Sequence, residues 1–369
     1  MFGGTYNKKK IFITGNTGFK GSWLSSWLVK LGADVYGFSK DIPTEPSLFK
    51  LLNLENKLKG NFIGNIKDKE RLHYFLDKVS PDFIFHLAAQ AIVSKSYDDP
   101  IETIESNILG TANLLEYLKE RNDRLNCVFI TSDKCYENKE WIWGYRENDI
   151  LGGKDIYSSS KACAELLIKS YMESFFKFQQ KHKVVSVRAG NVIGGGDWAK
   201  DRIVVDCFKN WANGMPVTIR SPKATRPWQH VLEPLSGYLH LGAELVKNSK
   251  LNFESFNFGP RSFDERTVEK LAEDLYAQWS LKHKSKVINE PILRGNIPFE
   301  EAGLLRLNCD KANNYLNWTP NLKYQECIEF IANWYITYYS NESDICEFTN
   351  QQISYYEDLA KGRELSWTI

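Results

Sequence analysis

Tyr157 and Lys161 lie four positions apart at the start of a long helical pattern, so on a helix they share one face. An ammonium group beside a phenol favours the phenolate and lowers its pKa, which would let the tyrosine act as a base near neutral pH. The same spacing is also common in a solvated pair on an ordinary helix. The catalytic interpretation therefore depends on a nucleotide-binding fold upstream.

Three adjacent residues could complete such a proton-transfer site. Ser132, Asp133 and Lys134 follow the apolar run 127–130, which predicts a buried strand. In an open α/β sheet, ligands bind beyond the carboxyl ends of the strands. We therefore expect these three side chains to face a substrate.

A glycine-rich turn near the N-terminus predicts binding of a dinucleotide. Residues 11–14 have the composition of a strand, and residues 22–31 have helical apolar spacing. Between them, Gly15 permits a tight turn, Gly18 lets backbone N–H groups approach a pyrophosphate, and Gly21 lets the helix pack on the sheet. Strand, turn and helix together carry more weight than the glycine spacing alone.

The end of the second predicted strand, 34–38, leaves the type of dinucleotide open. An acid normally holds the ribose hydroxyls there, but the position holds Ser39, followed by Lys40 and Asp41. Asp41 could turn back to the ribose, or Ser39 could hold it through one hydrogen bond. Lys40 would also suit a 2′-phosphate, although we favour NAD.

The alternation of strand and helix patterns favours an α/β fold with a doubly wound parallel (Rossmann) sheet. After the strand at 184–188 the character changes, which predicts a smaller mixed α/β C-terminal substrate domain. We predict a dinucleotide-binding domain at 1–190, a substrate domain at 191–340 with some strand and helix exchange between the two, and a peripheral polar tail at 341–369. His86 is flanked by apolar residues, so we interpret it as a hydrogen-bonded core residue.

Composition argues against several classes of protein. The 47 Lys and Arg residues nearly balance the 46 Asp and Glu residues, so nothing favours nucleic acid or a membrane as a partner. No apolar run is long enough to span a bilayer, and no apolar signal core follows the polar N-terminus. The seven cysteines are odd in number and include no C-x-x-C pair, which predicts reduced thiols in a cytoplasmic protein and no metal site.

Four longer runs are more specific than the glycine pattern. They are Thr-Ser-Asp-Lys-Cys-Tyr at 131–136, Lys-Glu-Trp-Ile-Trp-Gly-Tyr-Arg-Glu at 139–147, Arg-Ala-Gly-Asn-Val-Ile-Gly-Gly-Gly-Asp-Trp at 188–198 and Arg-Pro-Trp-Gln-His-Val at 226–231. With these runs the chain resembles the nucleotide-sugar dehydratases of the extended short-chain dehydrogenase/reductase family, and among them the members that act on CDP-linked glucose. The resemblance extends from about Lys10 to about Trp334.

The resemblance implies a redox-neutral dehydration: C4 of the sugar is oxidised with bound NAD+, water is lost across C5 and C6, and C6 is then reduced. It implies that Tyr157 removes the 4-hydroxyl proton, that Lys161 lowers the pKa of Tyr157 and holds the nicotinamide ribose, and that Ser132 hydrogen-bonds the same oxygen. Asp133 would protonate the departing 6-hydroxyl, which requires a raised pKa. Other nucleotide-sugar dehydratases carry Glu where this chain has Lys134. We hypothesise that Lys134 is the C5 base or stabilises the enolate, and wild-type turnover by Lys134→Ala would exclude both roles.

The strand ends and the resemblance together assign the remaining contacts. Expected cofactor contacts are Gly15, Thr17, Gly18, Phe19, Gly21, Ser39, Asn65, Ile66, Leu87, Ala88, Ala89, Gln90, Asn107, Thr131, Tyr157 and Lys161. Expected substrate contacts are Ser132, Tyr145, Arg146, Asn191, Asp197, Trp198, Arg202, Arg226 and His230.

The resemblance further implies a nucleotide-sugar substrate, CDP-glucose, and a homodimer or tetramer that forms through the helix at 104–120 and the helix after Tyr157. Two alternatives remain open at this point. One is a dehydratase or epimerase acting on a dTDP-, UDP- or GDP-linked sugar. The other is a non-catalytic NAD-binding regulator, since fold alone does not decide function.

Overall fold

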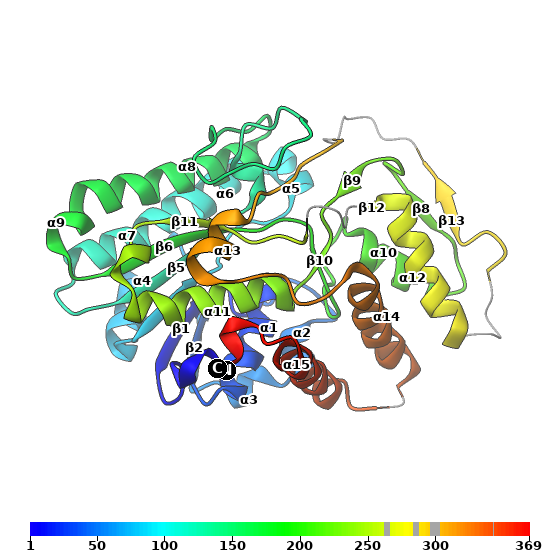
Figure 1. Ribbon diagram of the computed structural model, residues 1–369, viewed down its shortest axis with the longest axis horizontal. Coiled ribbons are helices and arrows are strands. Elements are labelled where there is room, and N and C mark those ends of the chain that lie inside the picture. The colour runs from blue at the N-terminus through cyan, green and yellow to red at the C-terminus, as the bar shows by residue number, and fades with distance from the viewer. Residues whose placement is uncertain (262–265, 283–287, 296–302, 342) are drawn as a thin grey trace.

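A seven-stranded parallel sheet forms the centre of the computed structural model, which describes residues 1–261, 266–282, 288–295, 303–341 and 343–369 (Figure 1). The strand order is β11-β6-β5-β4-β1-β2-β3, and every neighbouring pair is parallel. The strands are β1 (Lys10–Thr14), β2 (Asp34–Ser39), β3 (Gly60–Ile63), β4 (Phe83–His86), β5 (Asn126–Ile130), β6 (Lys183–Arg188) and β11 (Ser255–Asn257). The winding reverses between β1 and β4, the point where ligands bind in such sheets. The predicted doubly wound fold is confirmed.

Helices connect the strands and cover the sheet. The longer helices are α1 (Phe19–Lys30), α4 (Lys69–Val79), α7 (Gly110–Glu120), α8 (Ile156–Tyr171), α10 (Ile203–Ala212), α11 (Leu232–Lys247), α12 (Val268–Lys282), α14 (Tyr324–Ser340) and α15 (Ile345–Gly362). The shorter helices are α2 (Leu48–Leu51), α3 (Leu54–Lys57), α5 (Val93–Asp98), α6 (Pro100–Ile104), α9 (Lys177–Gln179) and α13 (Asp310–Leu316). Glu105–Leu109 and Met172–Phe176 are π-helical, and Phe2–Gly4, Asp133–Cys135, Ser249–Leu251 and Ser366–Thr368 are 3₁₀-helical.

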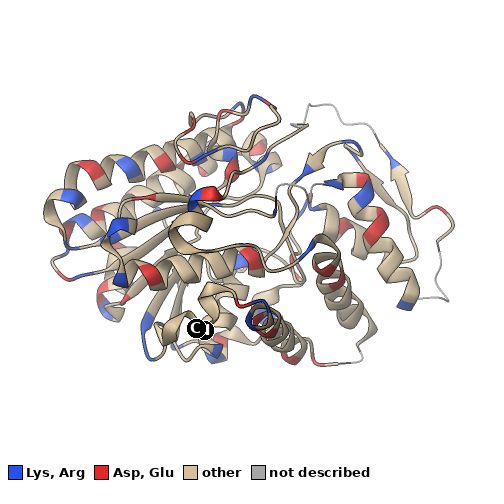
Figure 2. Ribbon diagram, viewed as in Figure 1, with Lys and Arg blue, Asp and Glu red and all other residues tan. Residues whose placement is uncertain are grey.

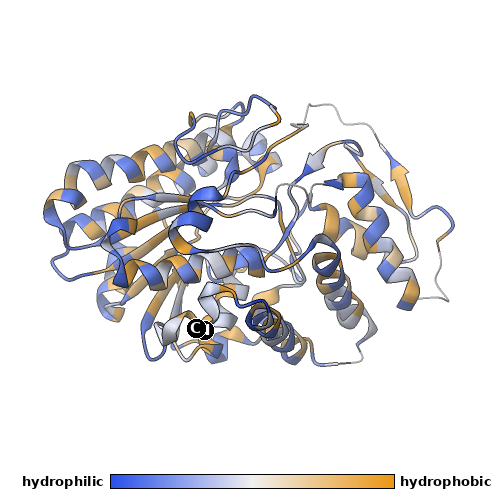
Figure 3. Ribbon diagram, viewed as in Figure 1, coloured by the Kyte–Doolittle hydropathy of each residue, from blue (hydrophilic) through white to orange (hydrophobic). Residues whose placement is uncertain are grey.

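Each face of the sheet has its own apolar core, because successive strand residues point to opposite faces. On one face Ile11 and Ile13 pack with apolar residues of α1 and α11. On the other face Phe12 packs with apolar residues of α4, α7 and α8. Helix α8 shows the alternating apolar and polar bands of a helix buried on one side (Figure 3), whereas most residues of α11 are buried.

A smaller lobe lies beside the sheet (Figure 1). Its strands pair as β13 (Ile292–Arg294) with β8 (Val217–Ile219), β12 (Arg266–Thr267) with β9 (Thr225–Arg226), and β10 (Gln229–His230) with β7 (Val192–Ile193). Helix α12 packs against α10 and α14 in this lobe. The chain enters it after β6, as the change in sequence character predicts.

The two lobes exchange elements along the chain. After β10 the chain returns to the sheet, where α11 packs on β5 and β6 and β11 pairs with β6. It then leaves again for α12 and α14. The predicted boundaries at residues 190 and 340 stay predictions.

The last segment differs from the predicted peripheral tail. Helix α15 packs against α14 and α1, and Trp367 is 1% exposed between Phe2, Trp27 and Tyr356. The Ile369 carbonyl accepts a hydrogen bond from the Gly3 amide at 2.6 Å, so the two termini lie together (Figure 1). This segment therefore closes the apolar core on the α1 face of the sheet.

Charges of both signs are interspersed over both lobes in this view (Figure 2). No helix in the described part of the chain has both the length and the apolar character needed to cross a membrane. All seven cysteines are free thiols.

Candidate active site

Ser132 and Asp133 lie at the carboxyl end of β5 and are both buried. The Ser132 hydroxyl donates to Asp133 Oδ1 at 3.0 Å, whereas Asp133 Oδ2 has no hydrogen-bond partner among the residues that the structure describes. Gly190, just after β6, passes so close that a methyl group there would collide with the Asp133 carboxylate. A buried carboxylate oxygen without a partner is costly unless a proton or a ligand satisfies it. Asp133 is therefore placed for proton chemistry.

Helix α8 brings Tyr157 and Lys161 to the same place. The Asp155 carboxylate caps the helix by accepting from the Ser158 amide at 2.9 Å, which fixes Tyr157 in the first turn and Lys161 in the second. Both side chains are buried, and Ser132 lies close enough to Tyr157 to act on its pKa. The structure thus unites the two runs that the sequence separates.

Burial dominates the ionisation of this pair. Desolvation raises the pKa of Tyr157 to about 12, although Ser132 and the charge of Arg202 act to lower it. Desolvation also lowers the pKa of Lys161 to about 8, against the opposing charge of Glu165. The net shift of the Tyr157 pKa is thus upward, because loss of hydration penalises the phenolate, and the predicted lowering by Lys161 stays a prediction.

Two further lysines border the site, and their ammonium groups make no hydrogen bond or ion pair with the described residues. Lys134 is half-buried, directly after Asp133. Lys20, in the first turn of α1, is a residue that the sequence analysis missed. Burial lowers the pKa of Lys20 to about 8, and the charges of Asp133, Arg202 and Lys161 act on it as well. The sequence feature that could have identified Lys20 is its position: it is a cation in the first turn of a helix, where the helix macrodipole disfavours positive charge.

A buried ion pair supports the site from below. Glu165 of α8 and Arg188 of β6 are almost fully buried and lie 2.7 Å apart, and Ser186 donates to the same carboxylate at 2.9 Å. The Thr131 hydroxyl donates to the other oxygen of Glu165. Thr131, expected as a cofactor contact, thus uses its hydroxyl to tie the end of β5 to α8.

The predicted dinucleotide turn has the required shape. Gly15 has φ +78°, and a Cβ there would lie 2.8 Å from the Ala88 amide nitrogen, so the turn abuts the end of β4. A Cβ on Gly21 would collide with the Gly15 carbonyl. Helix α1 begins at Gly18 without a side-chain cap, which leaves backbone N–H groups available to an anion. Phe19 begins the helix beside Gly194.

Ser39 supports this turn. Its hydroxyl donates to Asn16 Oδ1 at 2.7 Å and lies 3.3 Å from the Thr17 amide, and the Thr17 hydroxyl donates to the Asp41 carbonyl at 2.6 Å. Asn16 is a second residue that the sequence analysis missed. The sequence feature related to Asn16 is the glycine at position 37, because a Cβ there would collide with the Asn16 side-chain amide.

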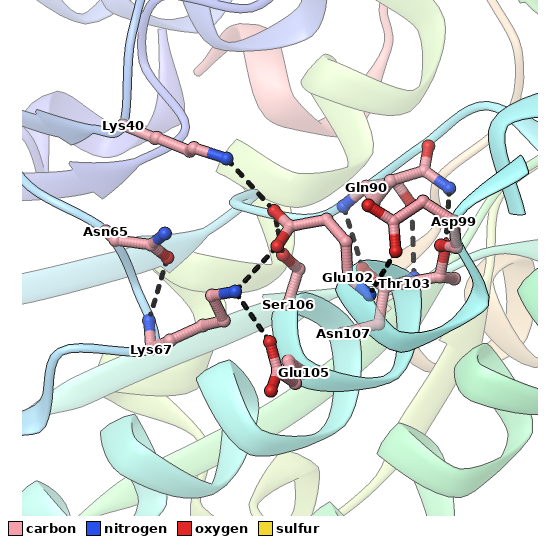
Figure 4. Close-up of polar contacts among 10 residues, drawn as sticks. All are labelled: Lys40, Asn65, Lys67, Gln90, Asp99, Glu102, Thr103, Glu105, Ser106 and Asn107. Atoms are coloured by element: carbon pink, nitrogen blue, oxygen red, sulfur yellow. Dashed lines mark hydrogen bonds and ion pairs between the residues drawn. The ribbon is translucent and has the colours of Figure 1, made fainter.

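The loop after β4 is held by Asn107 from the π-helical segment. Asn107 accepts from the Gln90 amide at 2.8 Å and donates to the Gln90 carbonyl at 3.1 Å and to Ser160 at 2.8 Å (Figure 4). Leu87, Ala88 and Ala89 lead into this loop. Asn107 thus joins the loop to the helix that carries Tyr157.

Asn65 and Ile66 follow β3. Asn65 accepts from the Lys67 amide at 3.1 Å, whereas Ile66 is buried and packs against Gly110 (Figure 4). Ile66 therefore supports α7 with its side chain.

Arg202 and Asp197 belong to the site on the substrate side. Arg202, at the start of α10, lies 4.0 Å from Asp197, and its charge acts on both Lys20 and Tyr157. Burial raises the pKa of Asp197, whereas Arg202 opposes this shift. Asn191 has a left-handed backbone, φ 50°, and its carbonyl accepts from Gln229.

Four expected substrate contacts lie in other surroundings. His230 is 0% exposed between Trp23 and Phe330, and Trp198 packs on Tyr338 of α14. The other two follow the loop after β5: the buried side chain of Tyr145 stacks on Tyr136, and exposed Arg146 pairs with Asp149. The described contacts of these four residues are with other protein side chains, and their role as substrate contacts stays a prediction.

Arg226 is largely buried. Its guanidinium donates to the carbonyls of Thr225 at 2.9 Å and Gly303 at 3.4 Å. The described contacts of Arg226 therefore brace the smaller lobe.

Comparison with known proteins agrees with this geometry. The family model described as GDP-mannose 4,6 dehydratase matches residues 12–331. A CDP-glucose 4,6-dehydratase from Salmonella typhimurium is 45% identical over 352 residues, which cover 94% of this chain and 96% of that protein.

Solved structures share the fold. A dTDP-glucose 4,6-dehydratase from Bacillus anthracis in complex with NAD superposes with a TM-score of 0.72 at 18% identity, covering 92% of this chain and 99% of that one. A UDP-glucuronic acid 4-epimerase from Bacillus cereus, in complex with UDP-glucuronic acid and NAD, gives a TM-score of 0.73 at 22% identity, covering 89% and 99%. The family match over residues 12–331 and the 45% identity to a curated relative over 94% of this chain show that it belongs to the GDP-mannose 4,6 dehydratase family, nucleotide-sugar dehydratases of the extended short-chain dehydrogenase/reductase type.

Proposed function

We propose that this chain is an NAD-dependent hydro-lyase that dehydrates CDP-D-glucose to CDP-4-dehydro-6-deoxy-D-glucose. The observation that carries the proposal is the 45% identity over nearly the whole chain to the Salmonella typhimurium CDP-glucose 4,6-dehydratase. The buried Asp133 fits this chemistry, because loss of the 6-hydroxyl needs an acid that an epimerase does not need. The choice of a CDP-linked sugar among the nucleotide sugars rests on that relative.

The residues at the carboxyl edge of the sheet fit NAD as the cofactor. The uncapped start of α1 at Gly18 suits a pyrophosphate, and Gly15, which tolerates no Cβ, keeps the turn close to β4. When bound, NAD+ supplies a hydride acceptor for C4 and returns the hydride to C6. Lys161 is placed to hold the nicotinamide ribose, and Asn107 holds the loop at Gln90.

The chain's own groups divide the proton transfers. Tyr157 takes the proton of the 4-hydroxyl, and the neighbouring Ser132 hydrogen-bonds the same oxygen of the substrate. Asp133 gives a proton to the departing 6-hydroxyl, since its free Oδ2 is buried and unpaired. Lys134 takes the C5 proton or stabilises the enolate, and wild-type turnover by Lys134→Ala would exclude both roles.

We further propose that the chain forms a homodimer in the cytoplasm. Exposed apolar side chains lie on α6 (Ile101 and Ile104), on the π-helical segment that follows it (Leu109) and on α8 (Leu166), and α8 packs against the other two elements. Large exposed apolar patches mark interfaces, and seven free thiols suit a reducing compartment. Leu166→Glu should give a monomer by light scattering, whereas Leu281→Glu, at another exposed leucine on α12, should not. An unchanged oligomeric state in Leu166→Glu would contradict this interface.

The direct test is to incubate the purified protein with CDP-glucose and NAD+. Loss of one water from the sugar nucleotide by mass spectrometry, with no net accumulation of NADH, is the expected result. Conversion of dTDP-, UDP- or GDP-linked glucose but not of CDP-glucose would support the dehydratase reaction and contradict CDP as the nucleotide of the substrate. Net release of NADH would indicate a dehydrogenase instead.

A further inference from the structure

Lys40 is a cation at the position where a dinucleotide fold distinguishes its cofactors. It follows Ser39, the last residue of β2, and the end of this strand faces the adenosine ribose in such folds. A cation there normally binds the 2′-phosphate of NADP, whereas an acid binds the free hydroxyls of NAD. The sequence offers the cation, but the last residue of the strand is Ser39 and not an acid.

The structure supplies an acid from a different element. Glu102 of α6 accepts from Lys40 Nζ at 3.1 Å through Oε1 and from Lys67 Nζ at 2.6 Å through Oε2. Ser106 also donates to Oε1 at 3.1 Å. Figure 4 shows the Glu102 carboxylate between the two ammonium groups, with Glu105 on the far side of Lys67.

The position of Glu102 is fixed by its helix. Asp99 caps α6 by accepting from the Glu102 amide at 3.0 Å, and Pro100 begins the helix. The Glu102 side chain is 16% exposed, compared with 54% for Lys40. Burial opposes ionisation of Glu102, but the hydrogen bonds from Lys67 and Lys40 outweigh it and lower its pKa to about 2. Glu102 is therefore anionic throughout the neutral range.

We propose that Glu102 makes the enzyme selective for NAD over NADP by engaging Lys40 and placing a fixed carboxylate beside the adenosine ribose site. This inference rests on the proposed NAD-dependent function. It assigns to a helix residue the role that an acid at the end of β2 has in other dinucleotide folds.

The argument is one of charge balance. A 2′-phosphate carries close to two negative charges and needs unpaired cations. Lys40 pairs with Glu102, and Lys67 pairs with Glu102 and Glu105. A 2′-phosphate that bound Lys40 would have to break its pair with Glu102 and lie next to a carboxylate. The ribose hydroxyls of NAD carry no charge and meet no such repulsion.

The test compares equilibrium binding of NAD+ and NADP+ to the purified, nucleotide-free enzyme by calorimetry. Glu102→Gln removes the charge and keeps the side chain's size, so it should lower the ratio of the NADP+ to the NAD+ dissociation constant about tenfold at low salt. Glu105→Gln is the matched control, because it removes the same charge but contacts Lys67 only. Lys40→Gln in the Glu102→Gln protein should cancel the gain.

Three outcomes would overturn the inference: an unchanged ratio in Glu102→Gln, an equal shift in Glu105→Gln, or a wild-type enzyme that prefers NADP+. If Glu102→Gln does not fold, Lys40→Gln alone provides the measurement. It should weaken NADP+ binding further and leave NAD+ binding unchanged, and equal loss of both would count against the proposal. A wild-type enzyme that bound neither nucleotide would instead contradict the proposed function itself.

Discussion

Asp133 combines two properties that seldom occur together in one carboxylate. One oxygen is hydrogen-bonded to Ser132, and the other is buried without a partner, pressed against the Gly190 backbone. Solvent cannot supply the missing hydrogen bond, so a proton or a substrate hydroxyl must. We therefore expect a change at Asp133 to affect the loss of water and to leave the oxidation at C4 intact.

Replacing Asp133 by Asn should stop elimination while leaving oxidation at C4 to Tyr157. Turnover of CDP-glucose should fall at least about 100-fold, the contribution typical of a general acid. Absorbance at 340 nm should rise and persist, because the oxidised sugar cannot proceed. Asp358→Asn, on the exposed face of α15, should behave as wild type. Turnover by Asp133→Asn near the wild-type rate would remove Asp133 from the mechanism.

Lys20 places a positive charge near Asp133 and has no ion pair among the residues that the structure describes. Its pKa, lowered by burial to about 8, means that the ammonium form prevails below about pH 8 and is lost above it. We expect Lys20→Met to lower kcat/KM at least about tenfold through loss of a charge-assisted contact to the anionic substrate. In the wild type, kcat/KM should decline above about pH 8, and Lys20→Arg should move that decline upward because arginine stays charged. Identical pH profiles for the three proteins would contradict this role.

At the scale of elements, the Glu165–Arg188 pair locks α8 to β6 beneath the reacting groups. Burial alone would raise the pKa of Glu165, but Arg188 and the hydroxyls of Thr131 and Ser186 hold it below its ordinary value of 4.5. A carboxylate with a lowered folded pKa stabilises the fold above its unfolded pKa. That stability is lost as pH falls from about 4.5 through the folded value.

Glu165→Gln should therefore destabilise the fold by about 3–5 kcal/mol at neutral pH, because it leaves Arg188 charged and buried. It should also flatten the loss of stability below about pH 4.5. Urea unfolding at several pH values measures both effects. Glu173→Gln, in an exposed pair with Lys177, should cost at most about 0.5 kcal/mol. A variant as stable as wild type at pH 7 would refute the structural role of the pair.

At the scale of the whole molecule, the last 27 residues close the core that the first 30 begin. Trp367 stacks on Phe2 and Tyr356 and meets the edge of Trp27, while Glu357 accepts from the Trp27 indole at 2.8 Å and pairs with Lys30. Contacts with the C-terminal segment therefore hold helix α1, whose first turn completes the dinucleotide turn.

Trp367→Ala should cost about 3–5 kcal/mol, as removal of a buried large aromatic side chain does. The denaturation midpoint should fall accordingly, and NAD+ binding should weaken only as far as the folded fraction falls. Ile369→Ala, at a side chain that is 89% exposed, is the control. An unchanged midpoint in Trp367→Ala would show that the C-terminus is dispensable for the core.

The sequence by itself determined the features that depend on short-range pattern. The alternation of strands and helices, the turn at Gly15–Gly21 and the Tyr157–Lys161 spacing are local, so composition and periodicity predict them. His86 is a further case: its ring bonds Thr14 at 2.8 Å and Thr111 at 3.2 Å, the core residue that its apolar flanks indicate. The resemblance to nucleotide-sugar dehydratases likewise rests on contiguous runs.

The tertiary structure alone determined two features of the site. The first is which polar side chains lie close together, and the second is which ionisation state burial favours for each of them. The charge of Asp133 acts on Lys20, although the two residues are 113 positions apart in the sequence. His230 belongs to a motif that favours ligand binding, but its ring packs between Trp23 and Phe330. The pKa of Tyr157 rises because the packed cleft removes its water, an effect no spacing of residues reveals. The physical reason is common to these cases: burial and charge proximity are set by elements distant in sequence, and local periodicity does not record them.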